Sequence, residues 1–143
     1  MELINSENNI DLTSQVGDLV IRRDIALEVN SVRSDRTMIS GYWQLAENKK
    51  FVIVDITFKN RTNKNYSLSP ITTMRLIDKD GVNYEVTSAV SITNGLGGEV
   101  MPDQTVTGEV GFTVPISQNE FEFEFRPTTG SKKTIVTNFV LDK

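Results

Sequence analysis

The chain has 143 residues, with 15 Lys or Arg and 19 Asp or Glu, so its net charge is −4 and its sequence pI is about 4.9. This length suits one domain with one hydrophobic core. The acidic balance argues against nucleic acid as a partner, because proteins that bind it carry a basic patch that neutralises phosphates. The sequence has no cysteine and no histidine, which excludes disulfides, thiolate metal sites and histidine-based catalysis.

The ends of the chain bear on its domain organisation and its compartment. Residues 1–14 are rich in Asn, Ser and Glu, so we expect a flexible leader at 1–14 and a single domain at 15–143. No apolar run reaches the ~20 residues of a membrane-spanning helix, and the N-terminus lacks the pattern of a signal peptide. If this N-terminus is native, we expect a cytoplasmic protein. If a signal segment has been removed, we expect a secreted or lipid-anchored one.

Apolar and polar residues alternate with a period of two along most of the chain. The first strand signal breaks near Arg22, which indicates one strand or two strand pieces. The run at 51–58 starts apolar on both faces, so we expect a central strand there. Residues 71–87 predict a hairpin, because Gly81 permits the positive φ of a short turn. In chain order, the expected strands are 19–29, 51–58, the two arms of the hairpin, 88–92, 106–114, 121–127 and 134–141, with a glycine-rich loop at 94–104.

The segment FEFEFRP at 121–127 shows the clearest alternation. Its three phenylalanines are expected to face the core, while Glu122 and Glu124 face solvent. No segment with helical periodicity exceeds about ten residues, the length at which a helix prediction becomes safe. Seven to nine strands, spaced 8–12 residues apart with turn signals between them, therefore predict an all-β fold. The expected architecture is an immunoglobulin-like antiparallel β-sandwich of two packed sheets.

The order of these motifs resembles a known family. The strand FVIVDITFKN at 51–60 and the segment PDQTVTGEVGFTVP at 102–115 carry the resemblance, together with the hairpin MRLIDKDGVNYEV and FEFEFRP. They are similar to the immunoglobulin-like domains of unknown function of many exported bacterial and archaeal lipoproteins. That family is related to the secreted immunoprotective antigen of mycobacteria, also called telokin-like. The resemblance spans about residues 15–141 and implies a sandwich fold and a place in the cell envelope, with no catalytic motif.

Two features of the chain depart from the family pattern. Asp103 stands where a glycine usually follows the first proline of the 102–115 segment, although aspartate also suits a turn. The signal peptide and the lipid-attachment cysteine of the family are absent from this sequence. The resemblance therefore implies export only for a chain that has been trimmed.

Acidic residues are the main candidates for chemistry. Glu122 and Glu124 stand two residues apart, a separation that fits the carboxylate pair of a glycoside hydrolase. Their alternation with phenylalanines explains them better as the solvent face of a strand. Asp78–Asn83 faintly matches a calcium loop, but the pattern lacks the bidentate glutamate, and a hairpin turn explains it better. We therefore expect no catalytic, cofactor-binding or metal-binding residue.

Three apolar residues in predicted connections are candidates for partner binding. Tyr42 and Trp43, the latter the only tryptophan, precede the central strand, and Leu96 lies in the glycine-rich loop. Tyr and Trp are enriched at interface hot spots, but large aromatics are more often buried between the sheets of a sandwich. We expect packing for Tyr42 and Trp43, with recognition through the loops around 38–45, 61–70 and 94–104.

These observations favour a non-catalytic binding or interaction module of the cell envelope. Its expected partner is a protein or an envelope component, with no nucleic acid and no cofactor. A structural or assembly subunit that oligomerises through sheet edges is the alternative, and a carboxylate-based hydrolase is a third hypothesis. The sequence leaves both a monomer and a weak oligomer open.

Overall fold

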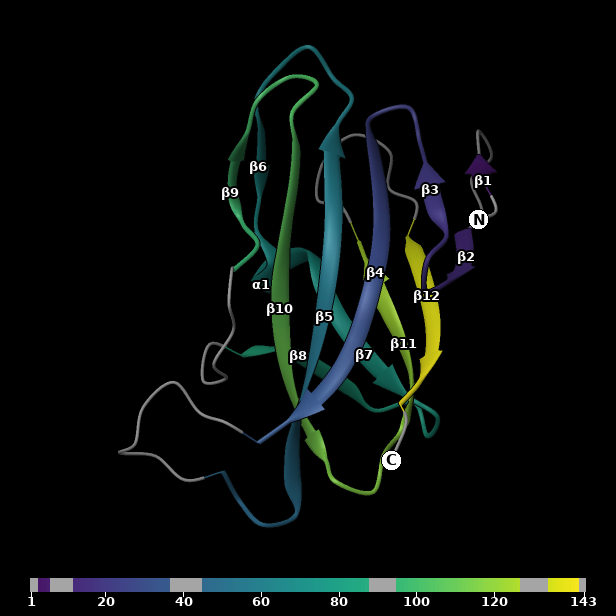
Figure 1. Ribbon diagram of the computed structural model, residues 1–143, viewed down its shortest axis with the longest axis vertical. Coiled ribbons are helices and arrows are strands. Elements are labelled where there is room, and N and C mark those ends of the chain that lie inside the picture. Colours follow the sequence, from purple (N-terminus) through teal and green to yellow (C-terminus); the bar gives the residue numbers. More distant parts are fainter. Residues whose placement is uncertain (1–2, 6–11, 37–44, 88–94, 127–133, 142–143) are drawn as a thin grey trace.

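The computed structural model describes residues 3–5, 12–36, 45–87, 95–126 and 134–141 (Figure 1). Within these residues the chain is mostly strand, and its one helix is the four-residue α1 (Pro70–Thr73). The strands form two layers that face each other, so the prediction of an all-β sandwich is confirmed. The structure divides the chain into more strands than the sequence indicated, because several are only three or four residues long.

Each layer contains one parallel edge pair and is otherwise antiparallel. In the first layer β1 runs parallel to β3, and in the second β2 runs parallel to β12. In spatial order the first layer contains β1 (Leu3–Asn5), β3 (Leu19–Ile21), β4 (Ile25–Asp35), β5 (Lys49–Asn60) and β10 (Thr105–Pro115). The second contains β7 (Met74–Asp78), β11 (Glu120–Phe125), β12 (Ile135–Val140) and β2 (Leu12–Gln15). Both β1 and β2 thus include residues from the stretch expected as a leader.

The strand β8 (Asn83–Thr87) joins the two layers on one side. It pairs with β7 in the predicted hairpin and with β10 in the first layer, so ten strands form one continuous sheet. On the other side, the short link between β2 and β3 carries the chain from one layer to the other. A separate two-stranded sheet pairs β6 (Tyr66–Leu68) with β9 (Gly98–Val100). The predicted glycine-rich loop at 94–104 therefore contains a short strand.

The strand β5 lies at the centre of the first layer. Its inward residues, such as Val52 and Phe58, belong to the main core, and Val54 pairs with Val110 of β10. Phe51 and Ile53 alternate with them and so point to the opposite face, yet they are 0% and 1% exposed. The start of β5 is thus covered on both faces, as its continuous apolar run predicted.

Phenylalanines from both layers meet in the core. The rings of Phe112 and Phe123 lie edge to face with centroids 6.4 Å apart, and those of Phe58 and Phe125 lie 6.0 Å apart. Burial of one such side chain contributes roughly 1.5–3 kcal/mol. The expectation that the alternating phenylalanines of β11 face the core is therefore confirmed.

One residue of β11 departs from the expected alternation. Glu124 is 8% exposed, although the sequence placed it on the solvent face with Glu122. Its Oε1 atom forms ion pairs with Arg75 of β7 at 2.9 Å and with Arg126 at 3.2 Å. These arginines cover the carboxylate and compensate its charge, so Glu124 is a buried, ion-paired residue on the outer face of β11 and not a solvated one.

The strand β4 changes its facing side at a β-bulge. Its pairing with β5 shifts between Val29 and Ser31, so Asn30 is an extra residue in the ladder. The Asn30 amide donates to Asp55 Oδ1 at 2.8 Å and to Thr57 Oγ1 at 2.9 Å. Before the bulge the odd-numbered residues face the core, and after it the even-numbered Val32 packs against the core instead. The bulge thereby brings an apolar side chain to this end of β4.

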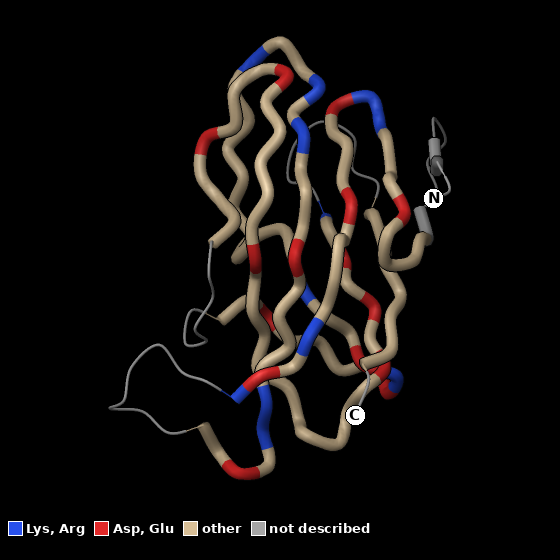
Figure 2. The backbone as a smooth tube through the Cα atoms, in the orientation of Figure 1, with Lys and Arg blue, Asp and Glu red and all other residues tan. Residues whose placement is uncertain are grey.

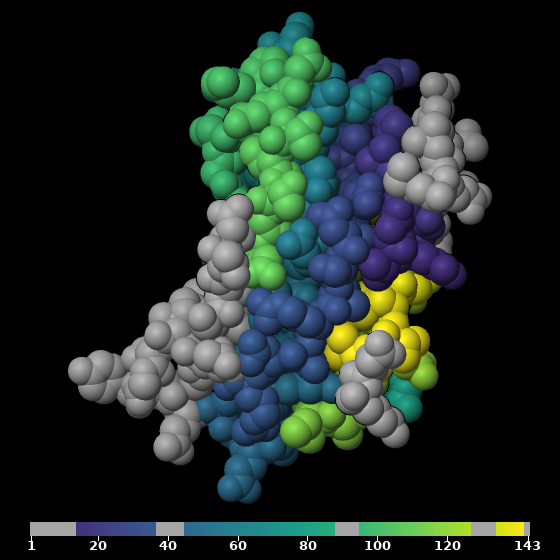
Figure 3. All heavy atoms as spheres, in the orientation of Figure 1, coloured from purple at the N-terminus to yellow at the C-terminus, as the bar shows by residue number. Residues whose placement is uncertain are grey.

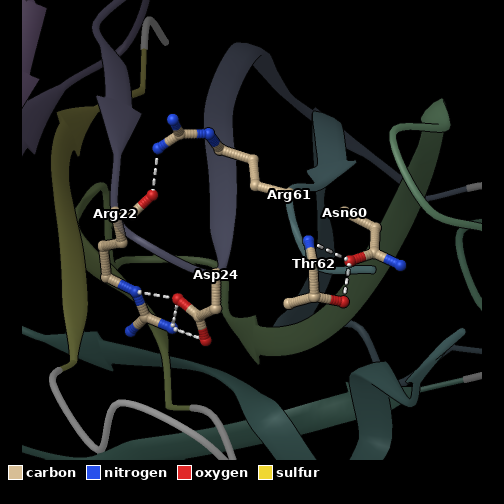
Figure 4. A network of polar contacts seen from close by, with 5 residues as sticks. All are labelled: Arg22, Asp24, Asn60, Arg61 and Thr62. Atoms are coloured by element: carbon tan, nitrogen blue, oxygen red, sulfur yellow. Dashed lines mark hydrogen bonds and ion pairs between the residues drawn. The ribbon is translucent and has the colours of Figure 1, made fainter. Parts of the chain in front are cut away.

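A cluster of polar residues closes the other end of β5. The Asn60 cluster consists of Arg22, Asp24, Asn60, Arg61 and Thr62 (Figure 4). Asn60 is 0% exposed; its amide donates to the carbonyls of Lys64 at 2.7 Å and Val100 at 3.0 Å, and its Oδ1 accepts from Thr62. Arg22 forms a bidentate ion pair with Asp24, and Arg61 donates to the Arg22 carbonyl.

This cluster explains the break between β3 and β4. The predicted strand 19–29 divides at Arg22–Asp24 because Arg22 turns inward to pair with Asp24. The backbone amide of Arg61 also donates to the Asp24 carbonyl at 2.9 Å. The polar groups of the Asn60 cluster thus form hydrogen bonds and ion pairs with other groups of the same domain.

Candidate binding groove

A groove of about 1070 Å³ lies between the two layers. It is lined by residues 30–32 of β4, away from Ile25, the residue of β4 that pairs with Asn60. We call it the seam groove, because residues of β4 from the first layer and of β12 from the second line it; in Figure 3 the surfaces of these two strands adjoin. Five segments line it: 15–16 beside β2, 30–32 of β4, 77–81 of the β7–β8 hairpin, 120–122 of β11 and 138–140 of β12.

The groove exists because the strands along the seam differ in length. The three residues of β3 pair only with Ala26, Leu27 and Glu28 of the eleven-residue β4. Likewise β2 pairs with β12 only as far as Asn138. The amide of Gly17, which turns with a φ of 92°, donates to the Val29 carbonyl at 2.8 Å and marks the limit of this closed part. Beyond it, among the residues that the structure describes, the two layers are separated by the groove.

Apolar side chains form the lower part of the seam groove. Phe121 and Phe139 are buried, with ring centroids 5.7 Å apart. Val32 is half-buried against the same core, whereas Val140 is 67% exposed. The groove thus has buried aromatic rings beneath it and an exposed aliphatic residue at its rim. Concave sites of mixed apolar and polar lining are common recognition sites.

Asp78 lies buried in the groove wall, and the hairpin turn uses its carboxylate. Oδ1 accepts the backbone amides of Asp80 at 2.8 Å and Val82 at 3.1 Å, and Oδ2 accepts the Tyr84 hydroxyl at 2.6 Å. Gly81 completes the turn with a φ of 85°. The predicted hairpin is confirmed. Hydrogen-bond donors of the hairpin occupy both carboxylate oxygens of Asp78, which the calcium-loop hypothesis assigned to the ion.

These hydrogen bonds shift the titration of both partners. The Tyr84 hydroxyl, followed by the turn amides, stabilises the ionised carboxylate and lowers the pKa of Asp78 despite its partial desolvation. Desolvation and the bond to Asp78 raise the pKa of Tyr84 to about 12. Asp78 is therefore ionised at neutral pH. A general acid in hydrolysis needs a raised pKa instead.

The remaining charges of the groove are exposed at its rim. Glu120 and Glu122 flank Phe121 on β11, and Lys79 lies in the hairpin turn. With Asp78 this gives three acidic groups and one basic group along the lining. Figure 2 shows acidic positions gathered at this end of the molecule, near the labelled C-terminus. The groove therefore carries a negative balance.

The carboxylates of the groove face different directions. Asp78 lies directly opposite Phe121 in the β7–β11 pair, so both point inward. Glu122 lies opposite Ile77 and points to the outer face of the same layer. Asp78 and Glu122 therefore cannot flank one bond. Glu122 and Glu124 do not form a catalytic carboxylate pair either, because the Glu124 carboxylate is ion-paired with two arginines.

Of the three residues that the sequence offered for partner binding, Leu96 is described, and it is not among the residues that line the seam groove. Tyr42 and Trp43 lie outside the described residues, so their packing stays a prediction. Leu96 is half-buried against the core, and its backbone amide donates to the Glu109 carbonyl at 3.1 Å. Its role in binding also stays a prediction. The groove was not predicted from the sequence. The signal that could have indicated it is the shift of apolar residues from odd-numbered positions, up to Val29, to the even-numbered Val32.

Within the described residues the structure has neither a cluster of metal ligands nor a membrane-spanning helix. No three His, Cys, Asp or Glu side chains gather there in a way that would hold a metal ion. In the same part of the chain, no helix has the length and apolar character needed to cross a membrane.

The comparisons with known proteins assign a family. A family model described as "Domain of unknown function (DUF4352)" matches residues 14–135. The chain belongs to this family. The resemblance drawn from the motifs at 51–60 and 102–115 is thereby confirmed, since both lie within the match. Curated proteins give no match.

Solved structures show the same fold at low sequence identity. The yjhA protein of Bacillus subtilis is 17% identical with a TM-score of 0.71, over 90% of this chain and 99% of that one. The secreted protein MPT63 of Mycobacterium tuberculosis is 16% identical with a TM-score of 0.66, over 94% and 100%. The B. subtilis protein ycdA, described as a "putative lipoprotein", is 17% identical with a TM-score of 0.66, over 82% of this chain but 37% of that one.

Proposed function

We propose that this DUF4352 domain is a non-catalytic binding module that acts outside the cytoplasm, with the seam groove as its binding surface. The observation that carries the proposal is the groove itself, which combines buried aromatic surface, an exposed valine and a negative rim. Concave sites of mixed apolar and polar lining are the usual place of recognition. The descriptions of MPT63 as a "secreted protein" and of ycdA as a "putative lipoprotein" support the location.

The state of Asp78 supports binding over catalysis. Its hydrogen bonds to Tyr84 and the turn amides favour the charged form, so it contributes fixed negative charge rather than a transferable proton. Glu122 faces the outer side of the layer. A carboxylate-based hydrolase needs two carboxyl groups on either side of one bond, and these two groups are not arranged in that way.

Site-specific photo-crosslinking tests the proposal. Val140 at the groove rim and Ile71 on α1 are matched probes, because both are aliphatic and they are 67% and 69% exposed. A benzoylphenylalanine placed at position 140 is expected to give discrete adducts with a component of the native envelope fraction. The same group at position 71 is expected to give none. Equal adducts at both positions, or none at either, would contradict the proposal.

An assembly subunit is the second candidate function, because β4 continues beyond β3 along the open seam. Open sheet edges pair readily with other strands. Light scattering of the purified chain separates the two candidates. A monomer across the micromolar range supports the binding module, whereas a concentration-dependent oligomer supports assembly.

A further inference from the structure

Within the described residues, part of the edge of β4 beside the seam groove pairs with no further strand. On the side away from β5, β3 pairs with Ala26, Leu27 and Glu28, and the Gly17 amide bonds to Val29. From Ser31 to Ser34, β5 is the strand that pairs with β4 within the described chain. Backbone donors and acceptors on a sheet edge are the recognition surface for an extended peptide.

The fold already fills the upper part of the seam in this manner. There β3 adds to β4 and β2 adds to β12, so short extended segments occupy both edges. The bulge at Asn30 then places Val32 toward the groove and turns Arg33 to the outer face, where it pairs with Asp35 at 3.1 Å and Glu109 at 3.3 Å. The charge of Arg33 is thus compensated on the outer face, on the side opposite the groove. Val32 provides an apolar contact on the groove side.

Charge indicates the chemistry of the occupant. Glu120 and Glu122, exposed on the outer face of β11 at the groove rim, and the ionised Asp78 in the groove wall outnumber Lys79 along the lining. Lys or Arg side chains of an incoming strand complement this negative balance at the rim, and its alternate apolar residues face the groove on the side of Val32.

We propose that the seam groove binds an extended basic segment of a partner protein, which adds a strand to the edge of β4 from Ser31 to Ser34. The bound segment alternates Lys or Arg with apolar residues. This inference rests on the proposed function and specifies the class of its partner.

Labelled synthetic peptides test the charge preference. One nonapeptide alternates Lys and Val, and its control alternates Glu and Val. Fluorescence anisotropy is expected to give a Kd at least tenfold lower for the Lys peptide, and its affinity is expected to fall as salt screens the charges. Equal affinity for both peptides would overturn the proposal.

Backbone methylation tests strand addition. In a strand, successive amides point to opposite edges, so only alternate amides can bond to β4. Two Lys/Val peptides are N-methylated on odd or on even residues. One is expected to lose at least tenfold in affinity while the other retains binding. Equal loss or equal retention would contradict strand pairing.

Protein variants test the site with a matched control. The double variant Glu120→Gln and Glu122→Gln is expected to weaken the Lys peptide by about two- to fivefold per charge. Glu85→Gln with Glu99→Gln removes the same charge from exposed residues that do not line the groove, and is expected to leave affinity unchanged. Equal effects of the two pairs would overturn the assignment to the groove.

These outcomes remain distinct from failure of the proposed function. If no peptide binds, or binding ignores charge and methylation, the strand proposal fails, while cross-linking at Val140 still tests whether the groove binds anything. A dimer that the groove variants dissociate would identify a second copy of this chain as the occupant and overturn the basic segment. Absence of cross-links at Val140 would remove the proposed function as well.

Discussion

Two groups of polar residues lie at opposite ends of the sandwich and differ in how their hydrogen bonds are used. In the Asn60 cluster, a fully buried amide bonds within the fold, and the side chain of Arg22 is 1% exposed beside Asp24. In the seam groove, Glu120 and Glu122 are exposed, and only Asp78 is committed to a turn. Buried polar groups must find partners inside the fold, whereas exposed ones are available for another molecule. The first group therefore stabilises the domain, and the second is suited to recognition.

The largest effect on stability is expected for Asp24→Ala. This change removes the bidentate partner of the buried Arg22 guanidinium, and breaking such a pair costs about 3–5 kcal/mol. Urea unfolding followed by circular dichroism measures the loss. The exposed Glu99→Ala serves as the control for removal of one carboxylate. A loss below that of the control would show that the Asn60 cluster is not a stabilising unit.

A smaller but still large loss is expected for Asn60→Ala. The change leaves the Lys64 and Val100 carbonyls and the Thr62 amide without their partner, at a cost of about 2–3 kcal/mol. Asn65→Ala, on the exposed loop that follows, is the matched control and is expected to change the free energy of unfolding by less than about 0.5 kcal/mol. Similar values for the two variants would contradict the contrast between buried and exposed amides.

A pH-dependent effect is expected for Tyr84→Phe. The lowered pKa of Asp78 means that its contribution is present above its unfolded pKa, ~3.9, and is lost as pH falls through the lower folded value. The phenylalanine variant lacks the strongest hydrogen bond to this carboxylate, so its stability is expected to fall less steeply in acid. At high pH, the Tyr84 pKa of about 12 predicts a further loss of stability between pH ~10 and about 12 that the phenylalanine variant lacks. Melting temperatures across pH measure both, and parallel profiles would count against the Asp78–Tyr84 bond.

The smallest effect on stability is expected for the groove rim. Glu120→Gln and Glu122→Gln change exposed side chains, so the free energy of unfolding should stay within about 0.5 kcal/mol of the native value. The same denaturation curves provide the test. A loss comparable to that of Asn60→Ala would make the rim part of the structural framework and weaken its assignment to recognition.

The sequence predicted the parts of the fold that depend on local periodicity. The run from Phe51 identified a strand covered on both faces, and Gly81 identified the β7–β8 turn. Both signals arise from neighbouring residues, because side-chain alternation and a positive φ are local properties. The break at Arg22 was equally visible, although its cause, the ion pair with Asp24, was not.

The groove and the bulge could not be predicted in the same way. Asn30 interrupts the ladder through bonds to Asp55 and Thr57, which are distant in sequence. Glu124 is buried because Arg75 and Arg126 cover it, a contact that strand alternation does not reveal. The seam groove depends on the relative lengths of β3 and β4, which only the pairing register establishes. Non-local contacts thus decided where the candidate site lies.

Mapping of bound peptide by backbone amide chemical shifts tests the central claim most directly. Titration of the labelled domain with the alternating Lys/Val peptide is predicted to shift amides of 30–34, 77–81, 120–122 and 138–140. Amides around Asn60, and those of 61–69 and 95–104, should stay unchanged. Shifts concentrated in those loops, with the seam groove unaffected, would contradict the assignment of binding to the groove.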